Sequence, residues 1–241
     1  MKVLDDLIAS LEQDAPVREV RTCVFWTAVI TRHCGLASTL RPEELPHGHG
    51  RVRGVGRLLD KSGLELAEYA RSDHPLEASI GVAAINSLLE IEESRCVELN
   101  AADLLVERGR GARVALVGHF PFIPRLREAA GTLWVIEKRP RGDELPAEAA
   151  PEVIPQADVV AITGTTLINH TFESLMALCR PESFVLLLGP SAPLSPVLFD
   201  HGVDVICGTQ VVDAEAVLRC ISQGASFRQV EGVRLLTMTR G

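Results

Sequence analysis

The sequence predicts an α/β protein in which a small α+β domain precedes a doubly wound domain with a mainly parallel sheet. Three observations lead to this prediction. Short apolar runs bounded by turn residues recur through the second half of the chain, and helix-length segments separate them. The first half instead combines amphipathic segments with one stretch rich in β-branched and aromatic residues. Because continuous apolar runs are typical of strands covered on both faces, the two halves predict different layer arrangements.

The second domain, expected over residues 111–241, alternates strands and helices. The strands are expected at residues 112–118, 133–139, 158–164, 184–189 and 203–208, and the helices at 121–131, 165–179 and 213–224, with a short segment near 195–199. Thr165 or Thr166 is expected to cap the 165–179 helix, and Asp213 the last one. The proline-rich segment 140–156 is interpreted as a solvated linker rather than a lid.

The first domain is expected over residues 1–110. Residues 3–13 carry apolar side chains on one face of a helix, and residues 17–31 are typical of antiparallel strand. Further helices are expected at 63–70, from Pro75 to about residue 94, and at 101–111 behind Asn100 as N-cap.

Composition argues against several functional classes. The 241 residues, 46% of them hydrophobic, contain no apolar run near the roughly 18 residues needed to span a bilayer. The N-terminal segment is acidic and does not resemble a secretory signal. A net charge of −8 argues against nucleic-acid binding as the main task. Six scattered cysteines without a CxxC pair indicate reduced thiols, so we expect a cytoplasmic protein with no membrane partner.

Two strand-end segments mark the expected site. TGTT at residues 163–166 and GPSAP at residues 189–193 follow two of the expected strands. The carboxyl ends of parallel strands meet at one edge of the sheet, which is where open α/β sheets bind ligands. The hydroxyl groups and the free N–H groups at the start of the following helix suit an anionic group, whereas ordinary helix capping is the structural alternative.

Several of these segments together resemble the putative heavy-metal chelation family. They are INS at 85–87, VGHFPF at 117–122, EKRP at 137–140, GDELP at 142–146, ADVVAITGTTLINHT at 157–171 and GPSAPLSP at 189–196. The resemblance covers nearly the whole chain. It implies an N-terminal domain similar to that of enolase, a Rossmann-like C-terminal domain, and a ligand site in the cleft between them. It also implies a role in metal handling, without naming a reaction.

The end of the first parallel strand supplies one group of candidates. Gly118 and His119 stand where a dinucleotide-binding protein has its glycine-rich turn, although GxGxxG is absent. Glu137, nineteen residues after Gly118, matches the acid that binds a ribose hydroxyl in such domains. A nucleoside or methyl-donor cofactor needs no pyrophosphate cradle and is compatible with this spacing. The alternative is an exposed carboxylate paired with Lys138 or Arg139.

The remaining candidates lie on other segments of the expected cleft. Asn86 stands in a helix that is apolar on almost every side, so its amide must bond to a ligand or to the other domain. His170, expected with Asn169 in the first turn of the 165–179 helix, is an acid/base or metal-ligand candidate, or a structural histidine. The full set of expected ligand contacts is Asn86, Gly118, His119, Glu137, Gly164, Thr165, Thr166, Asn169, His170, Gly189, Pro190 and Ser191.

No metal site is predicted from ligand spacing. His33–Cys34 and the pair His47 and His49 are close pairs of metal-ligating residue types, and neither builds the four-ligand pattern of structural zinc. We therefore expect no structural zinc and leave catalytic residues, metal ligands and cofactor unassigned. The sequence predicts a protein that binds a small, anionic or amino-acid-like ligand or a metal chelate in the interdomain cleft. A transferase with a nucleoside-containing cofactor and a non-catalytic sensor or carrier stay open as alternatives, as does self-association.

Overall fold

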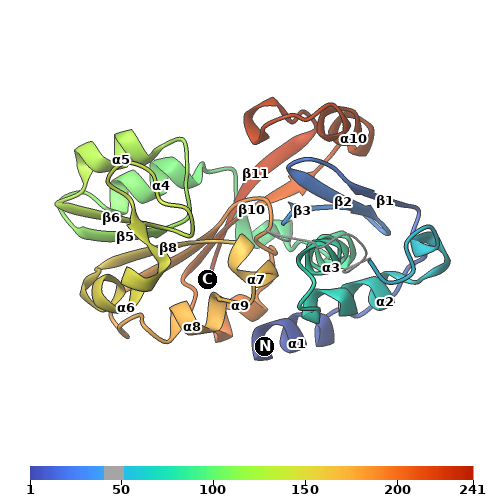
Figure 1. The fold of residues 1–241 in the computed structure, drawn as a ribbon, viewed down its shortest axis with the longest axis horizontal. Helices are drawn as coiled ribbons and strands as arrows, with labels where there is room; N and C mark the ends of the chain where they lie inside the picture. Colours follow the sequence, from blue (N-terminus) through green and yellow to red (C-terminus); the bar gives the residue numbers. More distant parts are fainter. Residues whose placement is uncertain (41–51, 241) are drawn as a thin grey trace.

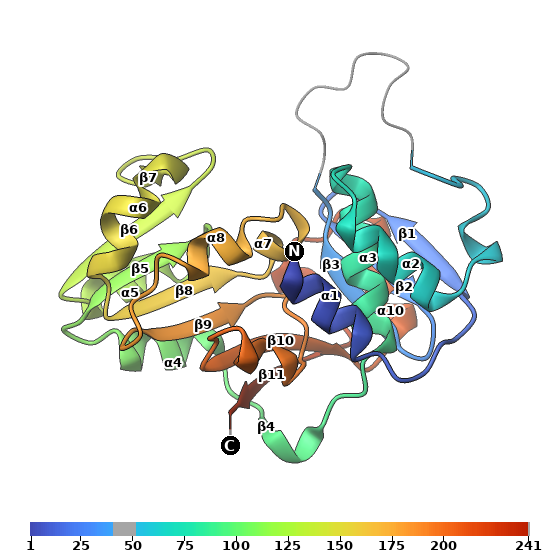
Figure 2. The ribbon, with the colours of Figure 1, turned by 90° about the horizontal axis from the view of Figure 1, so that it is seen from below.

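The computed structural model describes residues 1–40 and 52–240, and they form two β-sheets with helices packed on both (Figure 1). The small sheet has three antiparallel strands in the order β1-β2-β3. The large sheet has eight strands in the order β4-β11-β10-β9-β8-β5-β6-β7. Figure 2 shows the small sheet and α3 at one end of the molecule and the helices α4, α5 and α6 at the other.

The small sheet and its helices come from the first half of the chain. Their bounds are α1 (Lys2–Ala9), β1 (Glu19–Thr22), β2 (Trp26–Ile30), β3 (Cys34–Ser38), α2 (Gly63–Ala67) and α3 (Pro75–Leu88). Helix α3 crosses the sheet closely because Gly35 of β3 has no side chain. A Cβ atom there would lie 2.0 Å from the carbonyl oxygen of Ala83. The near-uniform apolarity of α3 reflects this burial, since it packs against strands on one face and α2 on another.

The large sheet is parallel from β10 to β7 and antiparallel at its other edge. Its strands are β4 (Cys96–Val97), β5 (Arg113–Val117), β6 (Thr132–Glu137), β7 (Leu145–Pro146), β8 (Val159–Thr163), β9 (Phe184–Leu188), β10 (Val205–Val211) and β11 (Val233–Thr239). The helices that follow β4 in the chain are α4 (Ala101–Arg108), α5 (Ile123–Ala129), α6 (Ala150–Val153), α7 (Thr165–Ile168), α8 (Phe172–Met176), α9 (Val197–Asp200) and α10 (Ala214–Ser222). The last of them, α10, packs against the small sheet.

Burial on both faces explains the continuous apolar runs of the parallel strands. Val114 and Leu116 of β5 belong to the core shared with α4 and α5, while Ala115 faces the opposite core with α7 and α8. In β8, Val159 and Ala161 likewise belong to the core with α4 and α5, whereas Val160 and Ile162 belong to the opposite core. Neither face is therefore left for polar side chains, which is the pattern expected of a doubly wound sheet.

The chain reverses its direction of winding between β5 and β8. It proceeds from β5 to β6 and β7 on one side, then returns to place β8, β9 and β10 on the other. Numbered along the chain, these six strands have the order 3-2-1-4-5-6, which is that of dinucleotide-binding Rossmann domains. The predicted fold class is confirmed.

The edge formed by β4 and β11 was not predicted. β4 precedes residue 110 in the chain but pairs with β11 of the large sheet. The two halves also share hydrophobic cores: Ile85 and Ala37 join the core that contains Leu167 and Leu194. The boundary at residue 110 stays a prediction, and the two halves pack directly on each other.

Two local predictions in the second half were wrong. The expected 165–179 helix is broken into α7 and α8, with His170 between them at a φ of 60°. Gly164 precedes α7 as its N-cap without a side-chain capping bond, so neither Thr165 nor Thr166 caps it. Asn169 accepts hydrogen bonds from the backbone N–H and the hydroxyl of Thr171, at 3.2 and 2.6 Å. This local turn competes with continuation of the helix.

The segment after Pro140 is not a featureless linker. It forms β7, which pairs with the end of β6, and continues through a 3₁₀ turn (Ala147–Ala149) into α6. The other 3₁₀ turns span Leu58–Asp60, Glu68–Arg71, Glu93–Arg95, Ile154–Gln156 and Phe227–Gln229. Within the described ranges, no helix is both long and apolar enough to cross a bilayer.

Candidate functional site

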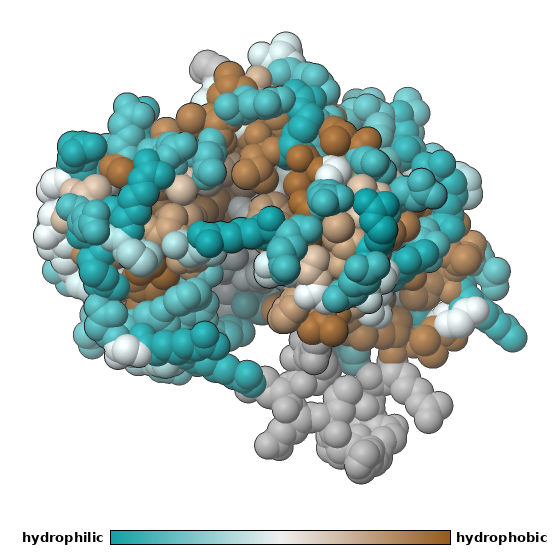
Figure 3. Space-filling view, turned by 90° about the horizontal axis from the view of Figure 1, so that it is seen from above, coloured by the Kyte–Doolittle hydropathy of each residue, from teal (hydrophilic) through white to brown (hydrophobic). Residues whose placement is uncertain are grey.

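A large cleft opens where β5, β6 and β8 end, beside the point at which the sheet reverses its winding. Its volume is about 1190 Å³, and the space-filling view is hollowed between the two halves of the molecule (Figure 3). Strand-end residues form its floor, and the 140–156 segment and α8 form further walls. The first half contributes Val24 and Phe25, both about half exposed, together with Thr39 and Leu40.

Gly118 and His119 lie in this cleft at the end of β5. Gly118 has a φ of 112°, a conformation that favours glycine, and a Cβ atom there would lie 3.0 Å from Cβ of Thr163. β5 and β8 already pair along their length, and the turn at Gly118 packs closely on Thr163 as the chain continues to His119. The His119 Nδ1 atom lies 2.5 Å from Oε1 of Glu144.

Glu144 is a site residue that the sequence analysis did not identify. Its side chain is 6% exposed, although its neighbours in the loop are mostly exposed. Burial raises the pKa of this carboxyl, but hydrogen bonds from His119 and from the backbone N–H of Arg141 outweigh that effect and lower it overall. Glu144 is thus an ionised acceptor that fixes the orientation of His119.

Glu137 ends β6 and also lines the cleft. Its Oε2 atom accepts a hydrogen bond from the backbone N–H of Lys138, at 3.0 Å. Lys138, Arg139 and Arg141 follow at the rim, and all three are exposed. The rim therefore carries three cations, beside the carboxylates of Glu137 and Glu148.

The hydroxyl groups after β8 lie in the cleft but bond mainly to one another. Thr165 Oγ1 donates to Oγ1 of Thr163 at 3.1 Å, and Thr166 Oγ1 donates to the Thr163 carbonyl oxygen at 2.8 Å. Asn169 lines the same wall while its side-chain oxygen accepts from Thr171. These contacts organise the loop, and they leave a polar wall at the end of β8.

His170 points away from the cleft residues. Its Nε2 atom lies 2.8 Å from the carbonyl oxygen of Ala70, and Nδ1 lies 4.0 Å from a carboxylate oxygen of Asp73. Both partners belong to the first half of the chain, so His170 joins the two halves. The geometry agrees with the structural interpretation of this histidine rather than with the acid/base one.

The predicted site residues after β9 lie at a close-packed junction. Ser191 is buried, and its hydroxyl accepts from the backbone N–H of Ser38 at 2.8 Å and donates to Oγ of Ser38 at 3.1 Å. Gly164 packs against the same loop: a Cβ atom there would lie 2.5 Å from the nitrogen of Ala192. Gly164, Gly189, Pro190 and Ser191 are not among the residues that line the cleft.

Asn86 reaches this junction from the first half, as expected. Its Nδ2 atom donates to the carbonyl oxygens of Leu36 at 3.0 Å and Pro190 at 3.5 Å. Its Oδ1 atom is buried without a hydrogen-bond partner among the described residues. Asn86 therefore meets the loop after β9 but not the cleft at β5, β6 and β8.

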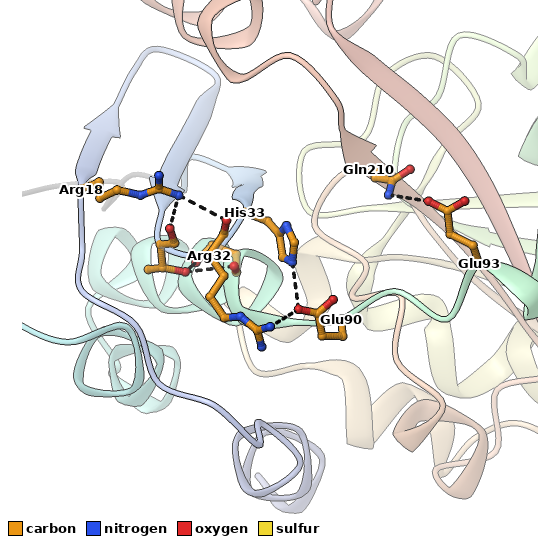
Figure 4. Close-up of polar contacts among 8 residues, drawn as sticks. Arg18, Arg32, His33, Glu90, Glu93 and Gln210 are labelled. Carbon is orange, nitrogen blue, oxygen red and sulfur yellow. Dashed lines mark hydrogen bonds and ion pairs between the residues drawn. The ribbon is translucent and has the colours of Figure 1, made fainter.

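Asn86 instead lines a second, smaller cavity of about 190 Å³. Two contact groups border it (Figure 4). Glu90 receives His33 Nε2 at 3.2 Å and the guanidinium group of Arg32, and Glu93 accepts from Nε2 of Gln210 at 3.3 Å. Of the twelve expected ligand contacts, six line the cleft, Asn86 lines this smaller cavity, and the remaining five line neither.

Of the two close pairs of metal-ligating residue types, only His33–Cys34 lies in the described part of the chain. Residues 47 and 49 lie outside the described part of the chain, so the prediction about them stays untested. Cys34 is buried, and burial raises its pKa to about 12. No three His, Cys, Asp or Glu side chains within residues 1–40 and 52–240 are grouped to hold a metal ion.

Fold and site together define a class of α/β protein with a small antiparallel sheet packed beside a Rossmann-type sheet and a cleft at its switch point. Sequence profiles described as "putative heavy-metal chelation" match residues 4–89 and 100–239. The chain belongs to this family.

One relative matches this chain in sequence, and two solved structures share its fold, each over nearly its whole length. An uncharacterized protein of Methanocaldococcus jannaschii is 26% identical, over 94% of this chain and 91% of that protein. A crystal structure of a family protein of unknown function from Desulfitobacterium hafniense DCB-2 has a TM-score of 0.86 at 25% identity, covering 99% of this chain and 98% of that one. A Pyrococcus horikoshii structure, also of unknown function, has a TM-score of 0.82 at 19% identity with the same coverage.

Proposed function

We propose that the cleft binds a small anionic ligand that carries a chelated metal, and that the protein handles such a chelate. The supporting observation is the position of the cleft at the switch point, with three exposed cations at its rim. Ligands of open α/β sheets bind at this position. A volume of about 1190 Å³ has room for a ligand larger than a single amino acid.

Charge at the rim favours an anionic ligand. Lys138 and Arg141 line the cleft with exposed side chains, and Arg139 lies between them. Three carboxylates also line the cleft. Glu144 is bonded to His119 and to a backbone N–H group, Glu137 accepts from the N–H of Lys138, and Glu148 is exposed. The other walls, at Val24, Phe25 and Leu175, offer apolar surface to the organic part of a chelator.

Native mass spectrometry of freshly purified protein tests this proposal. We expect a retained mass that is lost on denaturation and contains both metal and organic ligand. Lys138→Glu with Arg141→Glu should reduce retention, because two cations become anions at the rim. Arg110→Glu with Arg228→Glu, two exposed positions outside the cleft, makes the same charge change and should leave retention unchanged. Equal retention in both double variants would contradict the proposal.

A transferase with a nucleoside-containing cofactor is the second candidate. One observation favours it: Glu137 ends the second strand of a 3-2-1-4-5-6 sheet and lines the cleft, which is the position of the ribose-binding acid in Rossmann domains. A retained nucleoside without metal would support this candidate over the first. Glu137→Gln should then weaken retention, whereas it should change chelate retention little.

A further inference from the structure

We propose that Nε2 of His119 coordinates the metal of the bound chelate, and that the buried carboxylate of Glu144 is the positioning residue that prepares it. The inference rests on the proposed function, because it concerns the same cleft. It adds one specific bond: the lone pair of an imidazole nitrogen enters the coordination sphere of the metal and displaces one water molecule.

The carboxylate is held before any ligand arrives. The Glu144 backbone N–H donates to the Arg141 carbonyl oxygen at 3.1 Å, and Glu144 Oε2 accepts from the Arg141 N–H at 2.8 Å. Gly142, inside this turn, has a φ of 62°. Next to it, Asp143 pairs with Arg127 of α5 at 2.8 Å. The turn therefore fixes Glu144 through its own backbone and through a neighbouring helix.

This carboxylate determines which nitrogen of His119 remains available. Glu144 Oε1 can only accept, so Nδ1 of His119 carries the hydrogen of the 2.5 Å contact. The neutral ring then has its lone pair on Nε2. The side chain is 53% exposed and lines the cleft, so that lone pair is open to a ligand. A histidine whose second nitrogen donates to a carboxylate is the usual arrangement of metal-ligating imidazoles.

Three other histidines of the described chain, His33, His170 and His201, are arranged differently. Nε2 of His170 contacts a backbone oxygen, and Nε2 of His201 contacts Asp6 at 2.9 Å. His33 resembles His119 in exposure, at 49%, and also contacts a carboxylate. That carboxylate, Glu90, is 61% exposed, so water competes for it. His119 differs from His33 in having a buried, preorganised partner.

The chemistry suits borderline metals that prefer nitrogen ligands. Imidazole is a good ligand for Zn, Cu, Fe and Ni ions. A single histidine supplies one bond, and the remaining ligands come from the chelator itself. The basic rim would hold the carboxylates of the chelator, while His119 would contact the metal.

Two chelate probes separate this inference from the proposed function. Cu(II)–iminodiacetate has three chelator donors and one open in-plane position, which an imidazole can fill. Co(III)–EDTA is anionic and coordinatively saturated, so it tests cleft binding without a protein ligand. All variants carry His47→Ala and His49→Ala, which removes that pair as a competing copper site. Calorimetric titration measures affinity, electron paramagnetic resonance detects the coordinated nitrogen, and circular dichroism checks the fold.

We expect one Cu(II)–iminodiacetate site per chain that disappears in His119→Ala. Glu144→Gln should weaken it by about 10- to 100-fold, the usual effect of removing such a carboxylate partner. The matched variants His33→Ala and Glu90→Gln should leave this site unchanged. Co(III)–EDTA should still bind to His119→Ala, because it has no open coordination position for the imidazole to fill.

Each contrary outcome has one meaning. A copper site that survives in His119→Ala overturns the coordination by this residue. Equal effects of Glu144→Gln and Glu90→Gln overturn the positioning role. Suppose that Co(III)–EDTA binds, that Lys138→Glu with Arg141→Glu abolishes this binding, and that Cu(II)–iminodiacetate binding is unchanged in His119→Ala. Then the proposed function stands and only this inference fails. If neither probe binds, the proposed function fails.

Discussion

Replacing Gly164 by alanine distinguishes a ligand-contacting loop from a structural junction. The sequence places this glycine among the expected ligand contacts, directly after β8. In the structure it faces the loop after β9: an added Cβ would lie 2.5 Å from the nitrogen of Ala192 and 2.7 Å from the carbonyl carbon of Ser191. Ordinary contacts begin near 3.4 Å, so one backbone must move by almost 1 Å.

The expected consequence is lost stability rather than lost binding. Inserting a methyl group into a packed junction costs about 1–3 kcal/mol. For a chain of this size, each kcal/mol lowers the unfolding midpoint by about 2–4 °C, so Gly164→Ala should unfold about 2–12 °C earlier. Because the added methyl points at the junction, the affinity for the retained ligand, measured at a temperature where the variant is folded, should weaken by less than about tenfold, or 1.4 kcal/mol. Differential scanning calorimetry and native mass spectrometry measure the two quantities.

Gly63→Ala is the matched control. Its Cβ would meet only side-chain methyl groups of Leu88 and Thr31, at 2.9 and 3.1 Å, and these can turn away. Its free energy of unfolding should stay within about 1 kcal/mol of the wild type, since alanine is favoured over glycine in a helix. A Gly164→Ala protein with an unchanged midpoint and abolished retention would refute the junction assignment and restore this glycine as a ligand contact.

Three further predictions concern stability and thiol reactivity. Ser191→Ala should lower the free energy of unfolding by about 1–3 kcal/mol in urea, because the Ser38 N–H loses its acceptor; a change below 0.5 kcal/mol would count against that bond. Burial raises the pKa of Glu77, but hydrogen bonds from Ser72 and Arg53 outweigh it and lower the pKa overall. Its folded-state pKa is thus below its unfolded-state value. The ionised Glu77 therefore contributes fully to the free energy of unfolding above about pH 4.3, and this contribution is lost as the pH falls through the folded-state pKa. In urea titrations, the free energy of unfolding of Glu77→Gln should fall less steeply with acid than that of the wild type, and an identical slope would contradict this. Burial raises the pKa of Cys34 to about 12, so iodoacetamide at pH 8 should label it only after unfolding, and fast labelling of the native protein, seen by peptide mass spectrometry, would show the opposite.

The parallel strands were predictable because their signal is local. β5, β8 and β9 are mainly apolar runs, each followed by a glycine, and burial on both faces requires the apolar run. The edge strands were not, because β4 and β7 have two residues each and derive their structure from pairing with β11 and β6. Such strands have no periodicity to detect.

The break between α7 and α8 shows that a local hydrogen bond can interrupt a segment whose apolar periodicity predicts one continuous helix. Residues 165–179 contain enough apolar residues at helical spacing to predict one helix. The side chain of Asn169 nevertheless bonds to Thr171, and His170 adopts a positive φ. Asparagine and histidine tolerate that conformation more readily than most residues, which is the signal that could have located the break.

The sequence predicted the edge of the sheet at which the cleft lies, but it did not predict all of the residues that line the cleft. Gly118, His119 and Glu137 were expected at strand ends, and they line the cleft. Glu144 lies 25 residues from His119 in a segment interpreted as a linker, and only the pairing of β6 with β7 brings it to the cleft. Asn86 was correctly expected to reach the loop after β9, but Asn86 lines another cavity, and residues 189–191 of the loop line neither that cavity nor the cleft.

The rigid junction bears directly on how the cleft can bind. Ser191 with Ser38, Asn86 with Pro190 and His170 with Ala70 link the halves at three places. The shared hydrophobic core adjoins them, so relative movement of the halves would break buried contacts at each link. A ligand held between Phe25 of the first half and His119 of the second would therefore meet walls already in position, and little binding energy would be lost in ordering them. We accordingly expect selectivity to depend on the size of the chelate and on the direction of its open coordination position, because a fixed imidazole can reach the metal from one side only.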